Sequence, residues 1–301
     1  MWWVFEIIIF FYLISVGAFL IEVGTQWKHF KRKWFVGCLA VILALGWLTI
    51  FYGSFIEVKT LVVTEETIVL SEHPTESLTI AVVADFHLGP YKQERWAQTV
   101  VDTLMAHEPD LILIPGDFIF HKATDADMLD PLAELSAPYG VYAVTGNHDY
   151  EDQASQYVID TLMGLGITVL ENERERIMIG EKELVLAGIS DLWYEGDTHR
   201  AMTGVTREEV SILLSHNPDA VLYSNADLAD LVIAGHTHGG QIRLPWIGSL
   251  VRVPTELGNA YDKGLFEYNQ QQLFITAGVG ETGPRARLFN PPEINLLTIS
   301  L

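Results

Sequence analysis

Two long apolar runs lie at the start of the chain. They cover Trp2–Val23 and Trp34–Tyr52, which are 22 and 19 residues long, and their only charged residues, Glu6 and Glu22, lie near run ends. Helices of this length span about 30 Å, the thickness of a hydrocarbon core. A cleavable signal peptide is disfavoured, because no Lys or Arg precedes Lys28. The pattern therefore predicts a transmembrane helical hairpin.

The loop between the two runs is basic. Lys28, Lys31, Arg32 and Lys33 are the only basic residues among the first 58. Short basic loops stay on the cytoplasmic side of a membrane. We therefore predict a cell-membrane protein with two helices whose remaining chain, after Tyr52, lies on the extracytoplasmic side.

From Gly53 onward, short β-rich runs alternate with amphipathic stretches, which is typical of an α/β fold. Strands are predicted at 78–84, 111–114, 141–145, 167–170, 176–179, 183–187, 212–214, 231–234 and 273–276. Helices are predicted at 93–107, 125–135 and 152–165. Residues 53–76 are expected to form a tether or an edge-strand region, and residues 77–301 to form one folded domain.

Polar side chains follow five of the predicted strands. In chain order these are Asp85 and His87, then Asp117, then Asn147, His148 and Asp149, then His216, and finally His236 and His238. Ligands of open α/β sheets bind at the carboxyl ends of the strands. Residues i and i+2 of an extended chain project to the same side, so each Asp-x-His or His-x-His pair can reach one point.

Imidazoles, two carboxylates and an amide suit a divalent ion such as Mn, Fe or Zn. Seven such groups exceed the needs of one ion, whereas two ions that share one carboxylate would use them all. Each short motif is common without a metal, and a Gly-Asp pair after a strand is usually a turn. Five such motifs in order, each at the end of a predicted strand, arise by chance far more rarely than any one of them alone. The sequence therefore predicts a two-metal site.

Composition narrows the class of partner. The chain has 18 basic and 39 acidic residues, a formal net charge of −21. The part after Tyr52 carries −23 and repels phosphate backbones, so no long nucleic acid is expected as a partner. The single cysteine, Cys38, excludes an intramolecular disulfide and a cysteine-based zinc site.

The five motifs resemble those of the calcineurin-like metallophosphoesterases. In this sequence they read Asp85-Phe-His87, Gly116-Asp117, Gly146-Asn-His-Asp149, His216 and Gly235-His-Thr-His238. The segments 137–149, 215–219, 235–241 and 287–294 are also similar to the membrane-associated bacterial branch that includes the YkuE and YaeI phosphoesterases. The resemblance extends from about Leu78 to the C-terminus.

This resemblance implies a four-layer α/β/β/α sandwich of two mixed sheets, with residues 77–301 as the catalytic domain. It implies two divalent ions, with Mn the first expectation and Fe or Zn the alternatives. Asp85, His87 and His238 would hold the first ion, Asn147, His216 and His236 the second, and Asp117 would bridge them. A metal-bridging hydroxide would attack phosphorus in line, and His148 would be the acid for the leaving oxygen.

One position departs from the family pattern. Several members carry an acidic residue three positions after the bridging aspartate, where it orients the catalytic histidine, but this chain has Phe120. Asp149 is the candidate substitute. Arg243, Arg285 and Arg287 are candidate phosphate contacts, although surface charge is the simpler role for them.

The leading interpretation is a membrane-anchored phosphohydrolase, a phosphodiesterase or phosphatase, that acts on a small or membrane-associated phosphoester at a lipid bilayer. One alternative is the UDP-2,3-diacylglucosamine pyrophosphatase of lipid A synthesis, whose substrate is cytoplasmic and therefore conflicts with the predicted orientation. Another is a non-catalytic, metal-binding envelope module, supported by Phe120 alone. A nuclease is disfavoured by the negative charge.

Overall fold

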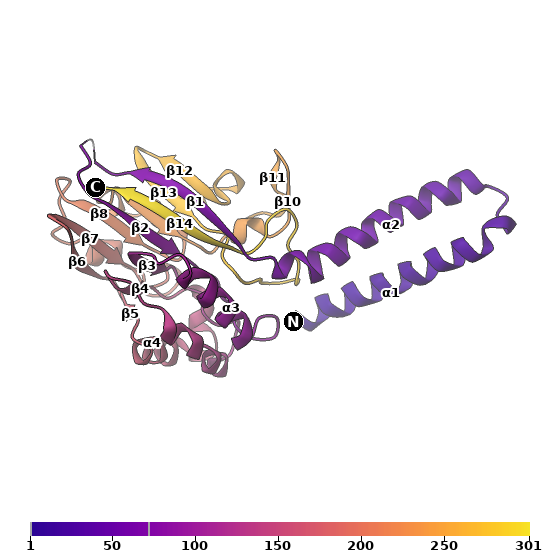
Figure 1. The fold of residues 1–301 in the computed structure, drawn as a ribbon, viewed down its shortest axis with the longest axis horizontal. Coiled ribbons are helices and arrows are strands. Elements are labelled where there is room, and N and C mark those ends of the chain that lie inside the picture. Colours follow the sequence, from indigo (N-terminus) through magenta and orange to yellow (C-terminus); the bar gives the residue numbers. More distant parts are fainter. Residues whose placement is uncertain (1, 72) are drawn as a thin grey trace.

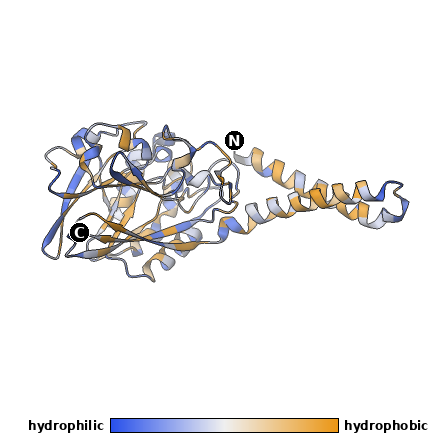
Figure 2. Ribbon diagram, turned by 90° about the horizontal axis from the view of Figure 1, so that it is seen from above, coloured by the Kyte–Doolittle hydropathy of each residue, from blue (hydrophilic) through white to orange (hydrophobic). Residues whose placement is uncertain are grey.

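The computed structural model describes residues 2–71 and 73–301. A long helical hairpin projects from a two-sheet domain (Figure 1). Its helices are α1 (Trp2–Gln26) and α2 (Lys33–Phe55), and a 3₁₀ turn at Trp27–His29 lies in the basic loop between them. Both helices extend a few residues beyond the predicted runs, and both are long and apolar enough to cross a membrane. Figure 2 shows the apolar colouring along both.

The open end of the hairpin is attached to the domain. Within the hairpin, the Trp47 indole donates to the carbonyl of Leu13 at 2.8 Å. The main-chain N–H of Arg287 donates to the carbonyl of Gly53, near the end of α2, at 3.0 Å. Glu6 of α1 forms an ion pair with Arg285 at 2.8 Å. Both helices are therefore tied to one segment of the domain.

The first sheet has six strands in the order β1-β14-β2-β3-β4-β5. Their bounds are Val62–Val69, Glu293–Ser300, Ser77–Val82, Leu111–Ile114, Val141–Ala143 and Thr168–Val169. β14 is antiparallel to β2, and the other neighbours are parallel. The region that we expected to be a tether or an edge strand thus contains β1 at a sheet edge.

The second sheet also has six strands, in the order β12-β13-β9-β8-β7-β6. Their bounds are Gly264–Tyr268, Gln271–Ile275, Leu231–Ala234, Val210–Leu214, Lys182–Gly188 and Glu173–Ile179. The four central strands are parallel, and the outermost strand on each side is antiparallel to its neighbour. A small separate hairpin is formed by β10 (Arg243–Leu244) and β11 (Gly248–Ser249).

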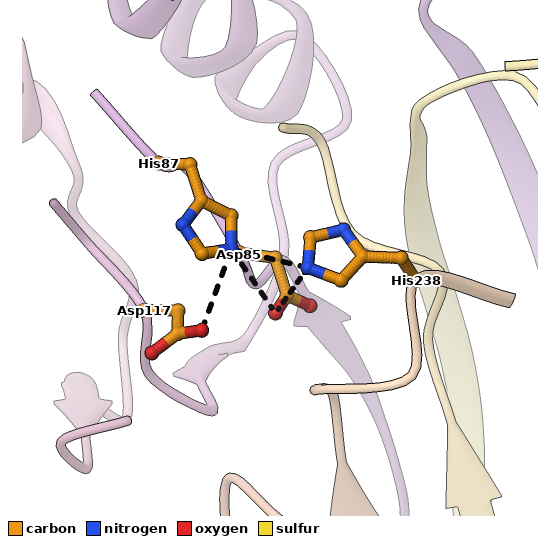
Figure 3. Close-up of side chains that lie close together, drawn as sticks. All are labelled: Asp85, His87, Asp117 and His238. Atoms are coloured by element: carbon orange, nitrogen blue, oxygen red, sulfur yellow. Dashed lines mark hydrogen bonds and ion pairs between the residues drawn. The ribbon is translucent and has the colours of Figure 1, made fainter. Parts of the chain in front are cut away.

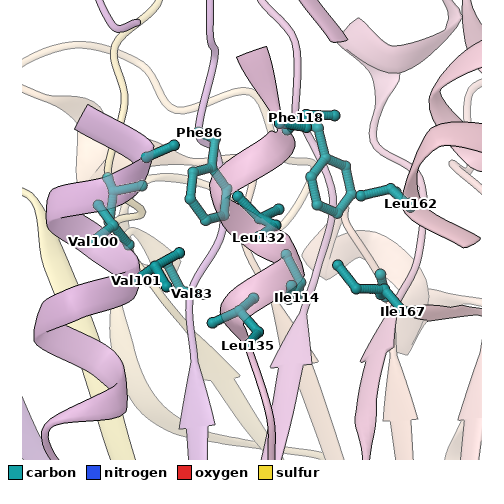
Figure 4. Close-up of a cluster of buried hydrophobic side chains, with 14 of the residues drawn as sticks. Val83, Phe86, Val100, Val101, Ile114, Phe118, Leu132, Leu135, Leu162 and Ile167 are labelled. Carbon is teal, nitrogen blue, oxygen red and sulfur yellow. The ribbon is translucent and has the colours of Figure 1, made fainter. Parts of the chain in front are cut away.

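Helices cover the outer faces of the sheets. The α-helices are α3 (Glu94–Met105), α4 (Ser155–Gly164) and the short α5 (Thr198–Ala201). Short 3₁₀ segments cover Glu57–Lys59, Asn147–Gln153, Pro218–Leu222, Ala226–Leu228, His238–Gly240 and Asn259–Tyr261, and the second of them is kinked at Glu151 and Asp152. One buried apolar cluster lies between the sheets and one lies under the helices of each sheet. Figure 4 shows the cluster under α3, where the rings of Phe86 and Phe118 stack with their centroids 6.1 Å apart. The fold is the expected α/β/β/α sandwich of two mixed sheets.

The secondary-structure predictions need some correction. The predicted helix at 125–135 is two 3₁₀ turns, Ala123–Met128 and Asp130–Glu134. Pro131 is the second residue of the second turn, and because proline has no N–H to donate, it prevents a continuous α-helix here. The sequence left β1 open as a tether or an edge strand and did not predict β10, β11, β12 or β14, and most other boundaries shift by one to three residues.

Candidate metal centre

The candidate ligands lie at the carboxyl ends of strands from both sheets. Asp85 and His87 follow β2, Asp117 follows β3, Asn147 and His148 follow β4, His216 follows β8, and His236 and His238 follow β9. The loops after β2, β3 and β4 belong to the first sheet, and those after β8 and β9 belong to the second. The face-to-face packing of the sheets therefore brings residues from distant parts of the sequence to one place.

One group of four buried residues could hold an ion: Asp85, His87, Asp117 and His238, whose ligand atoms all lie within 4.8 Å of one another. The two histidine Nε2 atoms are 3.1 Å apart. His87 Nε2 lies 3.4 Å from Asp117 Oδ2, and His238 Nε2 lies 3.5 Å from Asp85 Oδ1. Figure 3 shows these four side chains converging on one point.

A second group begins at the same Asp117 oxygen. Asp117 Oδ2 lies 3.2 Å from His216 Nε2, which in turn lies 3.0 Å from His236 Nδ1. The Oδ1 atom of Asn147 is buried without a hydrogen-bond partner, and the next residue, His148, donates its main-chain N–H to Asp117. Oδ2 of Asp117 is thus within reach of histidines on both sides.

These side chains fit divalent ions. Neighbouring ligands around an ion with bonds near 2.1 Å lie about 3.0–3.4 Å apart, which is close to the spacings found here. Asp85 Oδ2, Asn147 Oδ1 and His236 Nε2 are buried polar atoms without partners, and buried polar atoms normally have one. The donors are oxygen and imidazole nitrogen, which suit Mn, Fe or Zn.

Burial holds three of the histidines neutral, as ligands must be. Burial lowers the pKa of His87 and of His238 well below the ordinary value, and lowers that of His236 to about 3. His216 differs: although burial lowers its pKa, the adjacent Asp117 carboxylate raises it to about 10. Burial also raises the pKa of Asp85 to about 7. The negative charge of the centre is therefore concentrated on Asp117.

The backbone of the centre is strained. Positive φ angles between 44° and 69° occur at Asp85, His87, Asp117, His236 and His238. Non-glycine residues rarely adopt such angles, and they concentrate at functional sites. The loops also approach closely: a Cβ on Gly146 would lie 2.2 Å from Asp117 Oδ1, and one on Gly278 would lie 2.5 Å from Asp85 Oδ2. The convergence thus depends on these two glycines.

The His148 ring is oriented by main chain. Its Nδ1 lies 2.7 Å from the carbonyl oxygen of Phe120, with a Glu151 carboxylate oxygen at 3.4 Å. Burial lowers the pKa of His148, but Asp117, the Phe120 carbonyl and Glu151 outweigh this and raise it. Asp149 does not take this role, because its carboxylate accepts from four main-chain N–H groups, at 117–119 and 146.

The candidate phosphate contacts are engaged elsewhere. Arg287 is fully buried and donates to carbonyls of its own segment, including Ala277 at 2.8 Å and Gly280 at 2.6 Å. Surface charge, the simpler role considered for it, is wrong as well. Arg243 forms an ion pair with Asp262, and Arg285 pairs with Glu6 of α1.

Sequence reasoning missed an aromatic neighbour of the centre. The Trp193 ring stands edge-on to the His236 ring, with centroids 4.8 Å apart, and 58% of the tryptophan is exposed. Its main-chain N–H donates to the carboxylate of Asp191 at 2.9 Å. No residue pattern in the sequence signals this contact, because the loop that carries Trp193 meets the loop after β9 only through the tertiary fold.

The fold and the centre together define a metal-dependent phosphoester hydrolase. Residues 78–240 match the family described as calcineurin-like phosphoesterase, and the chain belongs to that family. It is 30% identical over 287 residues to YkuE, an uncharacterized metallophosphoesterase of Bacillus subtilis, covering 90% of this chain and 98% of YkuE. It is 29% identical to the phosphodiesterase YaeI of Escherichia coli, covering 73% of this chain and 81% of YaeI. A transmembrane protein with a metallophosphoesterase domain from Danio rerio is 29% identical, over 74% of this chain and 53% of that protein.

Proposed function

We propose that this protein is a membrane-anchored, two-metal phosphohydrolase whose catalytic domain lies outside the cytoplasm. The observation that carries the proposal is the position of Asp117 Oδ2, which is 3.4 Å from His87 Nε2 and 3.2 Å from His216 Nε2. A carboxylate oxygen between two histidine groups suits a bridge between two ions.

The ligands are assigned in two sets. Asp85, His87 and His238 would hold the first ion, Asn147, His216 and His236 the second, with Asp117 in both sets. Two ions held by these residues would supply an activated water for attack on phosphorus and would neutralise charge on the phosphate oxygens. Mn is our first expectation, with Fe and Zn as alternatives.

His148 is the proposed acid. Because its Nδ1 donates to the Phe120 carbonyl, its Nε2 is left to face a leaving oxygen. The raised pKa keeps a proton on the ring at neutral pH more often than in a free histidine. Phe120 therefore does not remove the support of the histidine, because the main chain at that position supplies it. The non-catalytic alternative loses its only argument.

The hairpin supports the proposed orientation in the membrane. Its basic loop lies at the end away from the domain, so a cytoplasmic loop places the domain on the other side (Figure 1). The substrate would be a phosphoester at or near the outer membrane surface. A pyrophosphatase of lipid A synthesis would need the opposite orientation for its cytoplasmic substrate. The name of YaeI, with 29% identity, favours a phosphodiester.

The function is tested with the full-length protein in detergent, loaded with Mn, Fe or Zn. Bis(p-nitrophenyl) phosphate and p-nitrophenyl phosphate are supplied in parallel, and bound metal is counted by elemental analysis. We expect two ions per chain and metal-dependent release of p-nitrophenol. In Asp117→Asn we expect loss of the bridge between the ions and loss of this release. Two bound ions without release from either substrate would contradict the proposed activity.

A further inference from the structure

Beside the metal centre, the β10–β11 hairpin carries an exposed apolar group. Its exposed residues are Trp246 (103%), Ile247 (70%), Leu250 (54%) and Val251 (53%). Phe289, in the adjoining loop before β14, is 58% exposed. We call these five residues the apolar tip. Contiguous exposed apolar residues on a folded domain mark an interaction surface, and tryptophan favours the boundary between lipid and water.

The apolar tip lies at the end of the domain from which the helices leave (Figure 1). Two consecutive residues connect the two features. The N–H of Arg287 donates to Gly53 at the end of α2, and the carbonyl of Leu288 accepts from Arg243 at the start of β10 at 2.9 Å. The base of the small hairpin is thus one residue removed from the helix junction.

The junction fixes the domain relative to the helices. Besides the Glu6–Arg285 ion pair, a carboxylate oxygen of Glu57 accepts from the main-chain N–H of Asn290 at 2.6 Å. Gly53 also packs against the same segment, since a Cβ there would lie 2.8 Å from the carbonyl oxygen of Arg287. The distance of the apolar tip from the helix ends is therefore set by the fold.

The charge distribution permits this face to approach a membrane. The segment 241–293 contains five acidic and five basic residues, so the net charge of −23 on the domain belongs to the rest of it. Arg252, beside the apolar tip, is exposed. An anionic lipid surface would repel most of the domain but not this segment.

The metal centre adjoins the same segment. The side-chain amide of Asn290 donates to the main-chain carbonyl of His238 at 2.7 Å, and the N–H of Ile242 donates to Gly240 at 2.5 Å. A surface that holds the apolar tip therefore also holds the loop that carries His236 and His238.

We propose that the apolar tip inserts into the boundary between headgroups and acyl chains of the leaflet that α1 and α2 enter. The metal centre is then held at the membrane surface, where it meets phosphoesters carried on lipid. This proposal rests on the membrane crossing and activity proposed above. The bilayer is what covers the apolar tip in this proposal, because α1 and α2 of the same chain enter the bilayer beside the apolar tip and are joined to the domain by a rigid junction.

The depth of the apolar tip is measured on the full-length protein in phosphatidylglycerol-containing nanodiscs. Cys38 is first replaced by alanine, and a spin label is attached at Ile247→Cys or at a control site, Met178→Cys, which is 55% exposed on β6. We expect the label at 247 to be accessible to oxygen, which dissolves in the bilayer, and shielded from a water-soluble paramagnetic relaxation agent. The label at 178 should be accessible to the water-soluble agent and less accessible to oxygen. Equal accessibility of the labels at 247 and 178 to the water-soluble agent would overturn the proposal. Dipolar coupling between spin labels at 247 on two copies, which would show that a second copy covers the apolar tip, would also overturn it.

Activity gives an independent readout. In proteoliposomes, the double variant Trp246→Ser/Ile247→Ser is compared with Met178→Ser on a diacyl-chain p-nitrophenyl phosphodiester and on soluble bis(p-nitrophenyl) phosphate. We expect at least a tenfold loss on the lipid substrate alone, because only that substrate must be met at the membrane. Equal rates of variant and control on the lipid substrate, or equal loss on both substrates, would overturn the proposal. If the wild type hydrolyses neither, the proposed activity fails, and the depth measurement still decides the docking.

Discussion

Asp149 is a residue whose side chain supports the centre without belonging to either ligand set. Its two carboxylate oxygens accept main-chain N–H groups from Gly146, Asp117, Phe118 and Ile119 at 2.8–3.2 Å. It thereby fixes the loop after β3 to the loop after β4. Because Asp117 has a strained φ of 59°, this support decides whether its carboxylate reaches both ligand sets.

We therefore expect Asp149→Ala to be more damaging than loss of one hydrogen bond. It leaves several buried N–H groups unpaired, at about 1–3 kcal/mol each where no water replaces the carboxylate. Thermal unfolding and bound metal per chain are the measurements. Asp149→Asn, which keeps one acceptor oxygen, should fall between wild type and Asp149→Ala. A fully metal-loaded, stable Asp149→Ala protein would contradict this role.

His148 and Phe120 allow a sharper comparison. His148→Ala should lower kcat by about 10²–10⁴, the usual contribution of a general acid, with metal content unchanged. Phe120→Leu should retain most activity, because the acceptor of His148 Nδ1 is the main-chain oxygen of residue 120. Steady-state kinetics with Mn-loaded protein checks both. A Phe120→Leu loss as large as that of His148→Ala would show that the phenyl ring is essential.

At this scale the sequence predicted which side chains meet, since strand ends and i, i+2 spacing identify them. It could not predict the partner of His148, because a main-chain carbonyl has no residue-type signature. It could not place Trp193 beside His236 either, since that contact depends on how two loops fold together.

Among the elements, the segment after β13 is held by a buried charge cluster. Arg287 and Lys92 both approach Glu281, at 3.6 Å and 3.3 Å, and all three are buried. Lys92 also donates to the carbonyl of Val58, just after α2. The cluster therefore links the helix junction, the segment at 277–291 and the loop before α3.

The cluster predicts a pH dependence of stability. Burial lowers the pKa of Lys92 to about 8, against an ordinary value of 10.5. Between these pH values the unfolded chain binds more protons than the folded one, so this group raises the free energy of unfolding with pH, by up to about 1.4 kcal/mol per unit. Below pH 8 its contribution is flat. Thermal unfolding of the wild type between pH 7 and 10 should show this slope relative to Lys92→Met, and parallel curves would contradict it.

Element prediction succeeded where apolar runs were short and uninterrupted, as at Leu111–Ile114 and Leu231–Ala234. It failed for β12 and left β1 open between a tether and an edge strand, because neither has a continuous buried apolar run: residues 65–67 of β1 and residues 265 and 267 of β12 are exposed. β14 was missed because Asn295 and Thr298 interrupt its apolar residues.

For the whole molecule, the hydrophobic pattern predicted the two-part organisation, an apolar hairpin and an α/β domain. It could not predict that the parts form a fixed junction, because the ion pair between Glu6 and Arg285 joins residues 279 positions apart. Charge patterning predicts the orientation, and that prediction can be tested directly.

A reporter fused after Leu301 tests the orientation. An alkaline phosphatase fusion should be active in cells, and a green fluorescent protein fusion exported in the unfolded state should be dark. Replacement of the loop cations Lys28, Lys31, Arg32 and Lys33 with glutamine should give a mixture of chains in the two orientations. The reason is that these cations hold the loop on the cytoplasmic side. A fluorescent fusion of the wild type would place the domain in the cytoplasm and revive the pyrophosphatase alternative.

The position of β14 has a consequence for biosynthesis. This strand, at Glu293–Ser300, pairs on one side with β1 and on the other with β2, and it is synthesised after every other described strand. The first sheet therefore cannot close before β14 has left the ribosome, even though α1 and α2 can already occupy the bilayer. Such long-range pairing is slow, and the open edges of β1 and β2 are exposed until it occurs. A nascent chain of this protein should thus depend on chaperones that bind the open edges until β14 has emerged.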